Sequence, residues 1–113
     1  MYNILESAHK LAALALEKKA EDIVLLDLRE LTSMSDYFII CSAPTNIQVK
    51  SIVNHIRDNL SNLEKPWYIE GASHNSWVLL DFIDLVLHVF QTETREYYNL
   101  EGLWADAKKE IIS

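Results

Sequence analysis

The stretch that decides the fold is residues 76–90, Ser-Trp-Val-Leu-Leu-Asp-Phe-Ile-Asp-Leu-Val-Leu-His-Val-Phe. Two apolar, β-rich runs, 76–81 and 84–90, flank the pair Phe82-Ile83 and are predicted to be strands. A two-residue connection is too short for a crossover helix, so the two strands are predicted to pair as an antiparallel hairpin.

The segment before this hairpin predicts a helix and a short strand. Apolar residues from Val49 to Leu63 follow at helical spacing, and Thr45 with Gln48 matches a capping box, so a helix is predicted over residues 46–63. Pro66 ends that helix. Residues 67–70 then form a short predicted strand, which Gly71 closes.

The two ends of the chain complete the predicted order α-β-β-α-β-β-β-α. Residues 3–19 show an amphipathic helical pattern, and residues 23–28 and 36–42 are predicted to be buried strands. Residues 95–109 are predicted to form one or two helical turns. The sequence therefore predicts an α+β fold with a mixed five-stranded sheet and packed helices, forming one domain over residues 1–113.

Charge and cysteine content limit the classes of function. The net charge is −7, and residues 66–106 hold seven acidic residues and one basic residue, Arg95. Nucleic-acid binding is disfavoured, because it requires clustered Lys and Arg. The acidic residues either keep the protein soluble or form a face for a basic protein partner. A lone cysteine, Cys41, and the lack of a long apolar run favour a cytoplasmic protein outside the membrane.

Asp81 and Asp84 are the strongest catalytic candidates, because two carboxylates at a hairpin could hold magnesium for nucleotidyl transfer. That chemistry also needs a glycine-rich loop for the phosphates, whereas Ser42-Ala43-Pro44-Thr45 contains no glycine. The four histidines are too far apart in sequence to predict a zinc site. We therefore expect no catalytic residue, no metal and no cofactor.

Trp77 is the main candidate for partner binding. Alternate residues of a strand point to opposite faces, so Trp77, Leu79 and Asp81 share one face, and Val78 and Leu80 share the other. If Val78 and Leu80 face the helices, Trp77 lies outward beside a carboxylate, as interface anchors do. The alternative is that Trp77 belongs to the core.

Several segments, in this order and spacing, resemble the ribosomal silencing factor (RsfS, Iojap) family. They are Ser35-Asp36-Tyr37-Phe38, Glu70-Gly71, Trp77-Val78-Leu79-Leu80-Asp81, Asp84, His88-Val89-Phe90, and Arg95 to Trp104, which is similar to the family ending Arg-x-x-Tyr-x-Leu-Glu-x-Leu-Trp. One departure is residues 42–45, where family members often carry glycine.

The resemblance implies a nucleotidyltransferase-like core without catalytic residues, and a protein that binds the large ribosomal subunit. The implied partner there is the basic ribosomal protein L-fourteen, and the bound protein would block joining of the small subunit and repress translation when nutrients are limiting. Free members are often homodimers. The implied contact surface comprises Glu70, Trp77, Leu79, Asp81 and Asp84. Two other hypotheses remain: a magnesium-dependent nucleotidyltransferase that uses Asp81 and Asp84, and an acidic module with no link to the ribosome.

Overall fold

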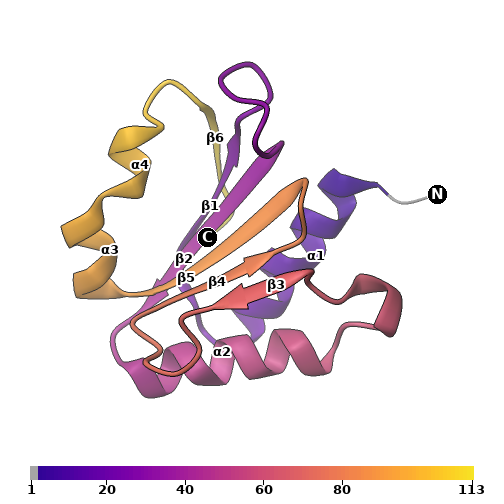
Figure 1. The fold of residues 1–113 in the computed structure, drawn as a ribbon. Helices are drawn as coiled ribbons and strands as arrows, with labels where there is room; N and C mark the ends of the chain where they lie inside the picture. The colour runs from indigo at the N-terminus through magenta and orange to yellow at the C-terminus, as the bar shows by residue number, and fades with distance from the viewer. Residues whose placement is uncertain (1–2) are drawn as a thin grey trace.

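The computed structural model describes residues 3–113 and contains one six-stranded mixed sheet with helices on both faces (Figure 1). In chain order the elements are α1 (Ile4–Glu17), β1 (Glu21–Asp27), β2 (Tyr37–Ala43), α2 (Asn46–Asp58), the 3-10 helix η1 (Asn62–Glu64), β3 (Tyr68–Glu70), β4 (Trp77–Asp81), β5 (Leu85–Gln91), α3 (Thr92–Tyr98), α4 (Leu100–Leu103) and β6 (Lys108–Ile111). The strands lie in the order β3-β4-β5-β2-β1-β6; β2 and β5 are parallel, and the other neighbours are antiparallel. The α+β class and the hairpin of β4 and β5 are confirmed.

The sheet has one strand more than the sequence predicts. Residues 108–111 form the edge strand β6 against β1, and the predicted helical turns wrongly extend over the first two of them, to residue 109. All four residues of β6 are exposed, so no alternation of buried and exposed side chains reveals the strand. Its position depends on backbone pairing with β1, which a reading of side chains cannot detect.

Two helices differ from their predicted extents. Helix α2 ends at Asp58, because the chain turns through η1 after Leu60, and Leu63 is 98% exposed. The predicted helical stretch at residues 95–109 is split into α3 and α4 by Asn99, which has the left-handed angles φ 46° and ψ 54°. Asparagine adopts this conformation more readily than most residues.

The main core lies between the sheet and the pair α1 and α2, which cover the same face (Figure 1). Val78 and Leu80 of β4 are fully buried there, so their side chains point to the helices as the alternation predicts. The Thr45 side chain accepts a hydrogen bond from the Gln48 amide (3.2 Å) and caps α2. Within residues 3–113, no helix has the length and apolar character needed to cross a bilayer.

The opposite face of the sheet is only partly covered. The helices α3 and α4 lie over it and help to form a second apolar cluster, in which Leu100 and Trp104 pack against Val24, Ile40 and Phe90. This cluster covers strands in the middle of the sheet. The edge formed by β3 and the neighbouring part of β4 remains accessible, and this edge carries the residues that the sequence selects for binding.

Candidate interaction surface

One accessible face of β3 and β4 brings together four of the five predicted contact residues. Trp77, Leu79 and Asp81 alternate with buried residues and point away from the main core. Strand β3 pairs antiparallel with β4, placing Tyr68 opposite Asp81 and Glu70 opposite Leu79. Paired residues share a face. We call these five residues, Tyr68, Glu70, Trp77, Leu79 and Asp81, the β3–β4 surface.

The β3–β4 surface combines apolar and acidic groups. Leu79 and Trp77 are half-buried, Tyr68 is 49% exposed, and Glu70 is exposed at the rim. Tyr68 did not stand out in the sequence, because β3 has only three residues and gives a weak pattern. Its position opposite Asp81 follows only from the pairing of the strands.

Asp84 lies next to this surface, in the turn between β4 and β5, and it is exposed. The Asp81 carboxylate accepts a hydrogen bond from the Ile83 amide (2.7 Å), which fixes a turn in which Ile83 has a φ of 77°. Residues 3–113 contain no group of three His, Cys, Asp or Glu side chains placed to hold a metal ion. Because Asp81 serves its own turn, the magnesium-dependent alternative is not favoured by this geometry.

The Trp77 indole is held in an aromatic cluster and does not stand free in solvent. Its ring stacks on Phe90 with a centroid distance of 4.7 Å, and Tyr98 of α3 lies 5.0 Å away. The indole nitrogen donates a hydrogen bond to Nδ1 of His88 (3.1 Å). Trp77 is therefore on the outward face, as the alternation predicts, but it is half-buried because α3 covers one side of it.

His88 and Cys41 are buried titratable groups of the central strands. Burial lowers the pKa of His88 to about 4, so its imidazole is neutral at pH 7. Burial likewise raises the pKa of the Cys41 thiol to about 12. A thiol of this kind is unreactive, because the thiolate is the nucleophile.

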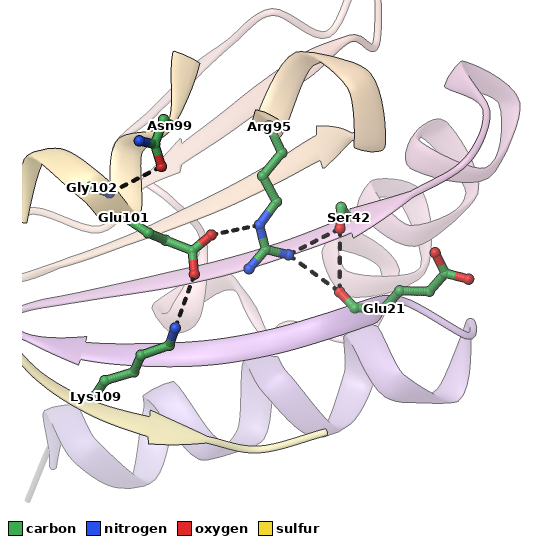
Figure 2. Close-up of polar contacts among 7 residues, drawn as sticks. All are labelled: Glu21, Ser42, Arg95, Asn99, Glu101, Gly102 and Lys109. Atoms are coloured by element: carbon green, nitrogen blue, oxygen red, sulfur yellow. Dashed lines mark hydrogen bonds and ion pairs between the residues drawn. The ribbon is translucent and has the colours of Figure 1, made fainter. Parts of the chain in front are cut away.

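Arg95 ties the covering helices to the sheet (Figure 2). Its guanidinium donates to the Glu101 carboxylate (2.8 Å) and to the Ser42 hydroxyl (2.9 Å), and Lys109 of β6 reaches the same carboxylate at 3.4 Å. Burial raises the pKa of Glu101, but Arg95 and Lys109 outweigh it, so the net pKa is lowered. Arg95 is the only basic residue of residues 66–106, a signal in the sequence that it has a specific partner.

Comparison with known proteins identifies the family. The sequence model described as "Ribosomal silencing factor during starvation" matches residues 2–113. The chain belongs to the ribosomal silencing factor family. It is 42% identical over 104 residues to the ribosomal silencing factor RsfS of Bacillus subtilis, covering 90% of this chain and 88% of that protein.

Structures and distant relatives of the ribosomal silencing factor family agree with this assignment. A crystal structure of a Chromobacterium violaceum protein superposes with a TM-score of 0.87 at 30% identity, covering 99% of this chain and 94% of that one. A mouse protein named "Mitochondrial assembly of ribosomal large subunit protein 1" is 31% identical over 98 residues, which are 83% of this chain and 43% of the mouse protein. The resemblance noted in the sequence is thus confirmed at the level of the family.

Proposed function

We propose that this protein binds the large ribosomal subunit through the β3–β4 surface and Asp84, and that its docking partner is the basic ribosomal protein L-fourteen. Bound there, it blocks joining of the small subunit and represses translation under nutrient limitation. It acts in the cytoplasm as a binding protein and not as an enzyme. The observation that carries this proposal is the position of Trp77 and Leu79 among acidic groups on an accessible sheet face.

The chemistry of the surface supports a basic protein partner. Glu70 and Asp81 lie on the surface itself, and Asp84 lies beside it, with no lysine or arginine among the five surface residues. Acidic groups at a rim accelerate encounter with a basic surface and orient the two proteins. Trp77 and Leu79 supply the apolar centre, where contact energy concentrates. The names of the ribosomal silencing factor relatives and of the mouse protein support the ribosome, and its large subunit, as the target.

The decisive experiment is co-sedimentation of the purified protein with isolated large ribosomal subunits in a sucrose gradient. Trp77→Ala removes the largest apolar group of the surface, and we expect affinity for the subunit to fall by about 30-fold or more, as for an interface hot spot. The same protein, without the substitution, should reduce formation of joined ribosomes when small subunits are added.

Ile47→Ala is the control. Ile47 is 78% exposed and lies on α2, which covers the face of the sheet opposite the β3–β4 surface. We expect Ile47→Ala to bind large subunits as the unsubstituted protein does. Equal binding by Trp77→Ala and the unsubstituted protein would show that the surface lies elsewhere on the molecule.

A further inference from the structure

The hydrogen bond between Trp77 and His88 has a consequence for binding. An exposed tryptophan at an interface can use its indole N–H as a donor to the partner. Here the N–H of Trp77 is already donated to Nδ1 of His88 at 3.1 Å. The indole therefore cannot donate a hydrogen bond to a partner and can contact it only through the carbon atoms of its ring.

The state of the imidazole follows from the same contact. Nδ1 of His88 accepts a hydrogen bond from the indole N–H, so it carries no hydrogen itself, and in the neutral ring the hydrogen must be on Nε2. Nε2 is buried and has no hydrogen-bond partner among residues 3–113. A buried donor without an acceptor is costly. The His88 side chain is only 3% exposed, so an apolar residue of similar size at this position would avoid the cost of the unpaired donor.

The remaining contacts of the indole show what the imidazole adds. Phe90 stacks on the ring, and Tyr98 contacts it at a tilt of 46°, but neither contact distinguishes the two orientations of the indole that a turn of about 180° around its Cβ–Cγ bond exchanges. The hydrogen bond to His88 does distinguish them, because the nitrogen must point to Nδ1. His88 is itself held by Phe38, with ring centroids 4.6 Å apart in an edge-on arrangement.

We propose that His88 is a positioning residue for partner binding: by accepting the Trp77 N–H, it presents the indole to the partner as an apolar edge in one fixed orientation. This inference rests on the proposed function, because it concerns how the β3–β4 surface is prepared for its partner. It specifies that the partner group that meets Trp77 makes van der Waals contact with the ring and accepts no hydrogen bond from it, since the N–H is donated to His88. A side chain fixed before binding loses less entropy when the complex forms.

The free protein tests the geometry without any substitution. In ¹⁵N NMR spectra of the unsubstituted protein, the indole N–H of Trp77 should exchange with solvent at least tenfold more slowly than that of Trp67, which is 75% exposed. The His88 ring should show Nε2–H with an unprotonated Nδ1. Equal exchange at the two indoles, or an Nδ1–H tautomer, would overturn the proposal.

The variant His88→Phe tests the effect on binding. Phenylalanine keeps an aromatic ring at this position, although a larger one, and removes the acceptor, so the Trp77 N–H should become rapidly exchanging. Affinity for large subunits should fall by up to about tenfold, because an indole that is not fixed beforehand must be ordered when the complex forms. His88→Asn, whose side-chain oxygen can occupy the place of Nδ1, should restore slow exchange and most of the affinity.

A double substitution separates positioning from a general structural role. Phenylalanine at position 77 has no N–H, so in a Trp77→Phe background His88→Phe should have no further effect on affinity. An equal, additive loss in both backgrounds would overturn the proposal. If Trp77→Ala abolishes binding but His88→Phe binds normally, this inference fails and the proposed function stands. If neither substitution affects binding, the proposed function fails first.

Discussion

Arg95→Met tests whether one partly buried ion pair holds the covering helices on the sheet. The side chains of Arg95 and Glu101 are 11% and 26% exposed, so the pair is partly shielded from water. Methionine keeps most of the length and apolar stem of Arg95 but leaves Glu101 with only Lys109 at 3.4 Å. The Ser42 hydroxyl also loses its charged donor.

The expected loss of unfolding free energy is about 2 kcal/mol. Breaking a fully buried pair costs roughly 3–5 kcal/mol and breaking an exposed one costs about 0–1 kcal/mol, and the residual exposure of Glu101 places this pair between them. For a domain of this size, the loss corresponds to a decrease of about 8 °C in Tm. Urea unfolding at pH 7, followed by circular dichroism, measures it.

Lys109→Met is the matched control for Arg95→Met. Lys109 contacts the same carboxylate, but its side chain is 45% exposed, so we expect a loss below about 0.5 kcal/mol. Arg95→Met combined with Glu101→Gln should recover part of the stability, because no partly buried carboxylate remains without its guanidinium, and Lys109 is exposed to solvent. If Arg95→Met costs no more than Lys109→Met, the ion pair does not hold the helices, and the reasoning is refuted.

Two further predictions concern His88, which accepts the indole N–H of Trp77, and Gly71, which lies against the Trp77 backbone. The pKa of His88 is lowered from 6.5 to about 4, so between these pH values the unfolded chain binds more protons than the folded protein. About 3 kcal/mol of stability that is present above pH 6.5 should therefore be lost as the pH falls to about 4. Urea unfolding at several pH values measures this loss, and a loss of the same size in His88→Phe would contradict the prediction. Gly71→Ala should destabilise the protein by about 2 kcal/mol or more, because Gly71 has a φ of 88° and an added Cβ would overlap the Trp77 carbonyl oxygen. Urea unfolding of Gly71→Ala measures this loss, and its NMR chemical shifts should differ from those of the unsubstituted protein mainly in β3 and β4. An unchanged free energy of unfolding would show that the turn at Gly71 can rearrange to accept a Cβ.

Strong local patterns made most of the fold predictable. The hairpin at residues 76–90, the capped helix after Thr45 and the outward face of Trp77 all follow from side-chain alternation or periodicity, since burial of apolar groups imposes those periods. The edge strand β6 and the early end of α2 were missed. Both are set by backbone pairing or by a turn, which leave little trace in the order of apolar residues.

The candidate site shows the same division. The sequence by itself determined that Trp77, Leu79 and Asp81 share a face, and its motifs determined the family. Only the tertiary structure decided that Tyr68 joins them opposite Asp81, that His88 accepts the indole N–H, and that Arg95 pairs with Glu101 and Ser42. The physical reason is the separation of the residues in the sequence. The alternation of a strand is fixed by adjacent residues, whereas these contacts depend on how separate strands and helices come to lie against one another.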